Sequence, residues 1–303
     1  MSGILLLGST GQVGWELERA LAPLGAVTAV TRPQLDLREP NSIRDAIRGT
    51  HPGIIVNAAG YTAVDRAESE PHLAMQVNGI APGIMAEEAR RIDALLVHYS
   101  TDYVFDGARA EPYVEADEPH PLNVYGRTKL AGERAIAAAG GAYLTLRTSW
   151  VYGARRPNFV LAILKLAGEK PELSVVEDQI GSPTWARALA AATVEILRNP
   201  GQAREAAGIY HLSAQGHTSR FDFARRILEI AREISGETMR MPELRRITAA
   251  QFPLPAVRPL NVATSKDRVE RVFGVRLPDW DTILRAFLEE LAPHGGWQRA
   301  PET

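Results

Sequence analysis

Short apolar runs alternate with amphipathic segments through the first half of this 303-residue chain. The runs are three to five residues long, and the segments between them repeat apolar residues at the helical spacings of three and four. Wholly apolar runs are typical of parallel strands covered on both faces. The pattern therefore predicts an α/β fold with a doubly wound parallel sheet. The expected strands are Ile4–Leu7, Val27–Val30, Ile54–Val56, Leu95–Tyr99 and Tyr143–Arg147, and the expected helices are Val13–Leu24, one opening at Pro40, Ala74–Arg91 and Asn123–Ala139.

The alternation loosens after Trp150, where loops rich in proline and glycine separate the periodic segments. We expect a dinucleotide-binding domain at residues 1–150 and a smaller, mainly substrate-binding domain at 151–292, whose strands could interleave with the sheet. Residues 293–303 are expected to be a frayed tail. The expected helices of the second half are Phe159–Leu166, Trp185–Leu197, Phe221–Ile234 and Asp279–Leu291, and its expected strands are Leu173–Val176 and Ile209–Leu212.

Composition and charge exclude several classes of protein. The chain has no cysteine, which rules out disulfides, thiolate metal sites and cysteine nucleophiles. Its 34 basic and 36 acidic residues nearly cancel, which argues against binding to nucleic acid or to an anionic membrane surface. The first apolar run is too short for a signal sequence, and no run approaches the ~18 residues of a membrane span. We therefore expect a cytoplasmic protein.

Three glycines follow the first expected strand and open the first expected helix. Gly8 would allow a tight turn, Gly11 would let the backbone approach a pyrophosphate, and Gly14 would let helix and strand pack closely. The helix N-terminus adds amide donors and a partial positive charge. In this strand–turn–helix setting the spacing G-x-x-G-x-x-G predicts a dinucleotide site.

The residues after the second expected strand favour NADP(H). Folds specific for NAD place an acid there for the ribose 2′-hydroxyl, but this chain has Thr31 and Arg32. Arg32 could pair with a 2′-phosphate in bidentate fashion, although nothing excludes NADH. Asp36 and Leu37 fall where a loop could contact adenine. The small-residue loop Asn57–Gly60, after the third strand, suits close passage of a ribose and nicotinamide.

A tyrosine and a lysine one helical turn apart form the candidate reacting pair. Tyr125 and Lys129 share one helix face, so both could point into one cleft. A free tyrosine has a pKa of about 10, and a shift to ~7 requires about 4 kcal/mol of differential stabilisation and hence a desolvated site. We expect the ammonium of Lys129 to lower the pKa of Tyr125. Thr101, after the fourth strand, could hydrogen-bond to Tyr125 or to a substrate carbonyl.

Several longer stretches carry a resemblance to one family. They are Gly11–Leu17, Asn57–Ala59 with Tyr61–Asp65, Tyr99–Phe105, Leu122–Gly126 and Arg147–Tyr152. On these stretches the chain resembles the extended short-chain dehydrogenases/reductases, and within them the dTDP-4-dehydrorhamnose reductases, which reduce a 4-keto sugar nucleotide to dTDP-L-rhamnose. The resemblance runs from about residue 3 to 290. It implies a Rossmann-like fold, NADPH as cofactor and a dTDP-sugar as substrate.

The resemblance also implies roles for individual residues. Tyr125 would donate a proton to the sugar 4-oxygen while the nicotinamide delivers hydride to C4, and Lys129 would hold the nicotinamide ribose and tune Tyr125, assisted by Thr101. The expected sugar-nucleotide contacts are Thr101, Asp102, Trp150 and, at the diphosphate, Arg258, although core packing is an equal alternative for Trp150. With the residues named above, the expected cofactor lining is Gly8, Gly11, Gln12, Val13, Gly14, Arg32, Asp36, Leu37, Ala58, Ala59, Gly60, Tyr61, Thr62, Tyr99, Tyr125 and Lys129.

The chain departs from the family at one position. Some members form dimers through magnesium held by interface glutamates, and Glu16 and Glu289 are present here, but Arg187 stands where an acid is expected. A cation there repels a divalent metal, so we predict a monomer or a metal-independent homodimer. The seven histidines show no ligand spacing such as H-E-x-x-H, so no catalytic metal is expected either.

Two alternatives remain open. A sugar-nucleotide dehydratase would want an acid–base carboxylate pair directly after Thr101, where this chain has Asp102 and Tyr103, and an epimerase-reductase with a catalytic cysteine is excluded by composition. A non-catalytic NADP-binding regulatory subunit belongs to a different functional class. Such a subunit would not need Tyr125 and Lys129, so their presence favours an enzyme.

Overall fold

A six-stranded sheet forms the centre of the protein in a computed structural model that describes residues 3–32, 34–236 and 241–294. Every neighbouring pair of its strands is parallel. The strand order is β10-β5-β4-β3-β1-β2. This arrangement confirms the predicted fold class. The strands are β1 (Ile4–Leu7), β2 (Val27–Val30), β3 (Ile54–Asn57), β4 (Leu95–Thr101), β5 (Tyr143–Thr148) and β10 (Gly208–His211).

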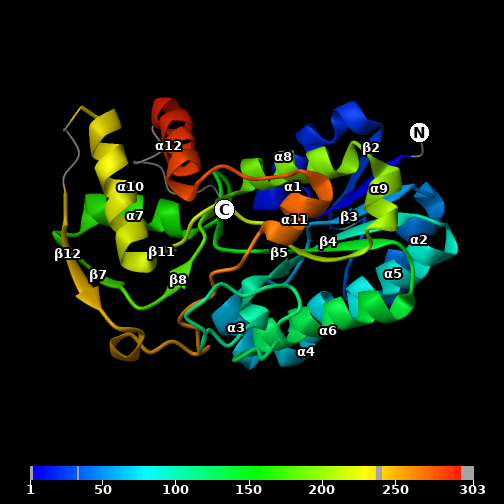
Figure 1. Ribbon diagram of the computed structural model, residues 1–303, viewed down its shortest axis with the longest axis horizontal. Helices are drawn as coiled ribbons and strands as arrows, with labels where there is room; N and C mark the ends of the chain where they lie inside the picture. Colours follow the sequence, from blue (N-terminus) through cyan, green and yellow to red (C-terminus); the bar gives the residue numbers. More distant parts are fainter. Residues whose placement is uncertain (1–2, 33, 237–240, 295–303) are drawn as a thin grey trace.

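Helices cover both faces of this sheet (Figure 1). Successive side chains of β1 point to opposite faces, so Leu6 packs with Leu17 and Leu189 in one cluster, while Leu5 packs with Ile43 in another. The first cluster lies under α1 (Gln12–Ala20) and α8 (Ala186–Leu197), and the second under α2 (Pro40–Thr50), α5 (Ala81–Arg91) and α6 (Val124–Ala139).

The strand order reverses at β1. The chain passes from β1 outward to β2 and then returns to β3 on the other side of β1, so the loops after β1 and β3 diverge at the carboxyl edge. In doubly wound sheets the crevice at this reversal is where ligands bind. The glycine loop and the loop after Asn57 flank it, as their places after β1 and β3 predict.

A second group of helices packs beside the sheet (Figure 1). It contains α7 (Phe159–Glu169), α10 (Arg220–Ile234) and α12 (Trp280–Leu291), packed around buried Phe223 and Phe287. Among the described residues, three two-stranded sheets complete it: β6 (Val151–Tyr152) with β9 (Thr184–Trp185), β7 (Glu172–Val176) with β12 (Glu243–Ile247), and β8 (Ile180–Gly181) with β11 (Thr218–Ser219).

Two predicted helices were wrong in their bounds. The helix expected at 13–24 ends at Ala20, because Pro23 has no N–H to continue it, and a 3₁₀ turn follows at Ala22–Leu24. The helix expected at 74–91 is interrupted by a π-helical turn at Gln76–Ile80, between α4 (Pro71–Met75) and α5. Pro82 lacks the N–H that would bond to the carbonyl of Asn78, which accounts for this interruption.

Several short elements were not predicted. They are α3 (Val64–Ser69), α9 (Pro200–Glu205), α11 (Asp267–Phe273), the strands β6, β8, β9, β11 and β12, and the 3₁₀ turns Asp102–Val104, Ala249–Gln251 and Ala292–His294. The strand expected at 209–212 joins the main sheet as β10, although it lies far beyond residue 150. The predicted division of domains stays a prediction. Most of the predicted tail, residues 295–303, lies outside the described residues.

Candidate active site

The loop after β1 demands glycine at two positions. Gly8 has a φ of +84°, and a Cβ built there would lie 2.7 Å from the backbone nitrogen of Ala59. A Cβ on Gly14 would lie 2.1 Å from the carbonyl oxygen of Gly8. Gly11 precedes α1 without a side chain that caps the helix, which leaves its first N–H groups for an anion.

The loop after β6 lies against the glycine loop. Asn158 donates from Nδ2 to Oε1 of Gln12 at 3.2 Å, and Arg156 donates from Nε to the carbonyl oxygen of Thr10 at 3.2 Å. Val13 is half-buried against the sheet cluster, so its side chain supports the loop from below. These contacts join the first loop of the sheet to the second half of the chain.

Arginines gather at the end of β2. Arg32 is exposed and adds to the positive potential around Asp36. Arg38 donates to both carboxylate oxygens of Asp36 at 3.0 Å, which lowers the pKa of Asp36 to about 2. Leu37 is half-buried against the cluster under α2. The acid of this loop is therefore held by Arg38, and the guanidinium of Arg32 faces solvent.

The predicted cofactor loop after β3 is held from behind by Asn78. Its residues Ala58, Ala59, Gly60, Tyr61 and Thr62 are half-buried or exposed. Asn78 accepts from the N–H of Tyr61 at 2.8 Å and donates to its carbonyl oxygen at 3.0 Å. The hydroxyl of Tyr61 donates to Glu70 at 2.6 Å. Because Asn78 lies in the π-helical turn, that irregular turn helps to fix the loop.

The reacting pair lies on the first turns of α6. Asn123 caps this helix by accepting from the N–H of Gly126 at 2.8 Å. A Cβ on Gly126 would lie 2.2 Å from the carbonyl oxygen of Tyr103, so glycine lets α6 approach the turn after β4. Tyr125 is half-buried and meets the ring of Tyr103 edge to face, whereas Lys129 is buried.

Lys129 contacts β4 rather than a carboxylate. Its Nζ donates to the carbonyl oxygen of Tyr99 at 2.5 Å and lies 3.1 Å from Nε2 of His98. Nδ1 of His98 lies 3.0 Å from Nδ2 of Asn57, the last residue of β3. Burial lowers the pKa of Lys129 to about 8, against an opposing effect of Glu133.

In the protein alone the pKa of Tyr125 is raised, not lowered as expected, and Lys129 is not among the groups that shift it. Burial raises the pKa of Tyr125, and the hydrogen bond with the Thr101 hydroxyl only partly opposes this rise. Asp102 and Tyr103 also act on the phenol and raise its pKa further. Lys129 is tied to β4 and does not contribute, so the phenol keeps its proton at neutral pH.

Asp102 is a buried carboxylic acid beside this pair. It accepts from the hydroxyl of Thr101 at 3.1 Å and from that of Ser149 at 2.6 Å. Burial raises its pKa to about 6, and these two hydrogen bonds moderate the rise. Behind it, the N–H of Ser182 donates to Ser149 at 3.2 Å, and buried Lys266 donates to the Ser182 hydroxyl at 3.3 Å.

Trp150 and Arg220 form an aromatic–cation pair near Asp102. Trp150 has a φ of +41°, a strained conformation for a residue with a side chain, and its indole is half-buried. The guanidinium carbon of Arg220 lies 3.5 Å from the centre of this ring. Burial lowers the pKa of Arg220, and the nearby Tyr103 and Asp102 act against this shift. The three side chains therefore lie close to one another.

Arg258 reaches the same region but is already paired. It donates to Oδ1 of Asp65 at 2.5 Å and to Oδ2 at 2.7 Å, and this pairing lowers the pKa of Asp65. Arg258 also acts on the pKa of Tyr103. It therefore lies near the turn after β4 with its charge largely matched by Asp65.

The structure brings most of the predicted residues to the carboxyl edge. Tyr99 is the exception, because its hydroxyl is bonded to Thr193 at 2.6 Å within the sheet cluster, and only its backbone reaches Lys129. Sequence reasoning missed Asn78, His98, Ser149 and Arg220. Ser149 lies within the stretch Arg147–Tyr152 and His98 precedes Tyr99–Phe105, but no spacing rule marks any of the four.

Comparison with known proteins decides the family. A family model described as the RmlD substrate binding domain matches residues 1–292. The chain belongs to the RmlD substrate-binding domain family. This RmlD-family chain is 44% identical over 282 residues to a dTDP-4-dehydrorhamnose reductase of Burkholderia thailandensis, which covers 91% of the chain and 95% of the relative. It is 42% identical to the Escherichia coli K12 enzyme of the same name, over 95% and 97% of the two chains.

A solved structure carries the same fold. The dTDP-4-dehydrorhamnose reductase of Bacillus anthracis, in complex with NADP, superimposes on the RmlD-family chain with a TM-score of 0.87 at 33% identity, over 95% of this chain and 99% of that one. The resemblance noted in the sequence is thereby confirmed. Among the described residues of the RmlD-family chain, no helix has the length and hydropathy needed to cross a bilayer.

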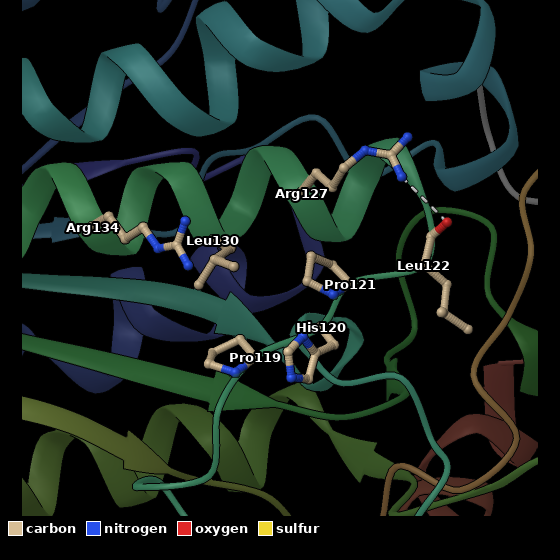
Figure 2. Close-up of a pocket in the computed structure, with 7 residues that line it drawn as sticks. All are labelled: Pro119, His120, Pro121, Leu122, Arg127, Leu130 and Arg134. Carbon is tan, nitrogen blue, oxygen red and sulfur yellow. Dashed lines mark hydrogen bonds between the residues drawn. The ribbon is translucent and has the colours of Figure 1, made fainter.

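A hollow of about 550 Å³ lies outside the reacting pair (Figure 2). It is formed by the loop at residues 119–122 and by Arg127, Leu130 and Arg134 of α6. Arg127 is two residues beyond Tyr125, which on a helix places the two side chains on roughly opposite faces. The hollow of this RmlD-family chain therefore opens away from the predicted site.

Arg187 occupies the position where other members of the RmlD family were expected to have an acid. It donates from Nε to Glu16 of α1 at 3.1 Å and from Nη2 to Glu290 of α12 at 2.7 Å. Arg187 thus pairs with Glu16 and Glu290, and the predicted interface residue Glu289 is not one of its partners. Across residues 3–32, 34–236 and 241–294 no group of three or more acids, histidines or cysteines could hold a metal ion.

Proposed function

We propose that this chain uses NADPH to reduce the 4-keto group of dTDP-4-dehydro-6-deoxy-L-mannose, which yields dTDP-L-rhamnose. The observation that carries the proposal is the meeting of Tyr125 with Thr101 beside the strand reversal, with Lys129 one turn along the same helix. The identity of 44% to a dTDP-4-dehydrorhamnose reductase supports the same substrate.

The carboxyl edge fits a dinucleotide. The close approaches at Gly8 and Gly14 leave the first N–H groups of α1 open to a pyrophosphate, and the small loop Ala58–Gly60 admits a ribose. Arg32 would pair with a 2′-phosphate, which favours NADPH, and a related reductase is in complex with NADP. When bound, NADPH supplies the hydride for C4 of the sugar.

Tyr125 is the proposed proton donor. Its raised pKa keeps the phenol protonated at neutral pH, which is the form that a reduction needs. The Thr101 hydroxyl orients the phenol through their hydrogen bond. As the 4-oxygen gains negative charge, Tyr125 gives it a proton, and Lys129, on the same helix face, would hold the nicotinamide ribose.

The substrate would lie over Trp150 and Arg220. Arg220 is the better candidate for the diphosphate, because Arg258 is held by both oxygens of Asp65. Asp102 lies beside Thr101 and can accept hydrogen bonds from sugar hydroxyls. Trp150 would then serve as a stacking surface whose position Arg220 fixes.

We infer that no metal joins two copies of this chain, since Arg187 already pairs with both Glu16 and Glu290 and would repel a divalent ion there. A monomer or a metal-independent homodimer follows from this pairing.

The test is turnover. Purified protein with NADPH and dTDP-4-dehydro-6-deoxy-L-mannose should oxidise NADPH and form dTDP-L-rhamnose in equal amounts, and the UDP-linked sugar should serve as the comparison substrate. Absence of NADPH oxidation by protein that binds NADPH would contradict the proposal.

A further inference from the structure

Three buried side chains form a continuous line behind the reacting pair. Asn57, His98 and Lys129 are 0%, 1% and 5% exposed. The contacts along the line are Asn57 Nδ2 to His98 Nδ1 at 3.0 Å and His98 Nε2 to Lys129 Nζ at 3.1 Å. At its far end the N–H of Ala59, in the predicted cofactor loop, donates to Oδ1 of Asn57 at 3.1 Å.

Counting protons along this line fixes the role of each atom. A backbone N–H can only donate, so Oδ1 of Asn57 is the acceptor for Ala59 and Nδ2 is the atom turned to His98. Nδ2 of an amide has no lone pair to offer, so Nδ1 of His98 must accept. Burial lowers the pKa of His98 well below its usual value, which keeps the ring neutral. Its one proton is therefore on Nε2.

An Nε2–H group needs an acceptor at Nζ. An ammonium has three N–H bonds and no lone pair, whereas a neutral amine has one lone pair and two N–H bonds. One of those N–H bonds is used by the carbonyl oxygen of Tyr99. We propose that Asn57 and His98 form a positioning relay that favours the neutral amine of Lys129 over its ammonium, with Nε2–H of His98 donating to the amine at Nζ.

The charged groups around Lys129 do not reverse its preference for the neutral form. Glu133, one turn along α6, favours an ammonium, but both of its oxygens are bound by Arg147 at 2.7–3.2 Å and both side chains are buried. The other titratable groups nearby are Tyr99 and His98 on β4, Tyr125 on α6 and Asp102 in the following turn, which is held by Thr101 and Ser149. Burial of Lys129 acts in the same direction as the relay.

Protonation of Lys129 then has a defined structural cost. The proton on Nε2 moves to Nζ, the proton taken up binds Nδ1, and Asn57 must turn Oδ1 toward His98, which releases the N–H of Ala59. The charge of the lysine is thereby coupled to the loop at Ala58–Gly60. That this coupling serves hydride transfer rests on the proposed function, whereas the protonation states do not.

The wild-type protein offers a direct test without substrate or cofactor. Only four lysines are present (Lys129, Lys165, Lys170 and Lys266), so ¹³Cε-lysine NMR gives few signals, which Lys129→Met and Lys266→Arg would assign. Lys129 is expected to titrate near pH 8, and the ¹⁵N shifts of His98 are expected to show the Nε2–H tautomer. A lysine that titrates near 10.5, or a His98 protonated on Nδ1, would overturn the proposal.

Two variants separate hydrogen bonding from added charge. Asn57→Asp presents an acceptor to Nδ1, which turns Nε2 into an acceptor and favours the ammonium. His98→Gln adds no charge but frees an amide oxygen to accept from Nζ. Both should raise the pKa of Lys129 by about one unit or more, tenfold in proton affinity. A rise in Asn57→Asp alone would assign the effect to charge and contradict the relay, as would no rise in either variant.

Discussion

The hydroxyl of Ser149 donates a hydrogen bond of 2.6 Å to Oδ2 of Asp102. Ser149 follows β5 and Asp102 follows β4, so this bond joins neighbouring strand ends directly beneath the proposed substrate position. It orients the carboxyl group but does not replace the water lost on burial, and the pKa of Asp102 stays raised, at about 6. Asp102 therefore lowers the stability of the protein at neutral pH.

Asp102→Asn should stabilise the protein and impair catalysis. The folded pKa of about 6 exceeds the ordinary 3.8, so the folded state binds more protons and the free energy of unfolding falls as pH rises between these values. At neutral pH the variant should be more stable by about 3 kcal/mol, and below pH ~3.8 the difference should vanish. Urea denaturation at both pH values measures this. An equal difference in stability between the wild type and the variant at both pH values would refute the assigned pKa.

Gly14→Ala should damage both stability and NADPH binding. The added Cβ would lie 2.1 Å from the carbonyl oxygen of Gly8, and relieving that overlap moves α1 or the loop at a cost of about 1–3 kcal/mol or more. Gly49→Ala, in α2, is the matched control, because no atom lies within 4 Å of its Cβ. It should stabilise the protein by about 0.5–1 kcal/mol. Thermal unfolding and fluorescence titration with NADPH would record both, and a harmless Gly14→Ala would argue against the close approach.

Arg220→Met should weaken substrate binding and spare the cofactor. Loss of a charge-assisted hydrogen bond is worth about 1.5–3 kcal/mol, so KM should rise roughly 10- to 100-fold. Arg225→Met on the same helix is the control, since Arg225 is exposed and paired with Glu229. Steady-state kinetics with both variants decides the point. An unchanged KM in Arg220→Met would return the diphosphate contact to Arg258.

Magnesium should not alter the molar mass of the protein. Arg187 places its guanidinium between Glu16 and Glu290, where a divalent ion would meet like charge. Light scattering after size exclusion, in magnesium and in EDTA, should give one mass. A dimer that forms only in magnesium would show that the metal displaces Arg187 from the two glutamates.

The local pattern of apolar residues predicts the sheet and its main helices, because apolar strands and helical periodicity can each be recognised within one short segment of sequence. The π-helical turn is a different case. Pro82 marks a broken hydrogen bond, but whether the chain kinks, ends or forms a π turn there depends on α6, whose Gly132 lets it approach Asn78. That contact joins residues far apart in sequence and is decided only by packing.

The part of the site that depends on sequence spacing along one helix could be predicted. Tyr125 and Lys129 share a helix face by periodicity alone. The direction of the Tyr125 pKa was not predictable, because it depends on burial and on the attachment of Lys129 to His98 and Tyr99. Arg220 was missed for a similar reason, since its stacking on Trp150 joins α10 to the end of β5 across the fold.

The proton donated by Tyr125 is the central claim, and single-turnover reduction by Tyr125→Phe with saturating NADPH tests it most directly. The variant should bind NADPH with unchanged affinity and reduce the 4-keto sugar about 10²- to 10⁴-fold more slowly. Tyr99→Phe, which removes a hydroxyl from the buried core instead, should keep the wild-type rate. Reduction by Tyr125→Phe within a few-fold of wild type would contradict the assignment.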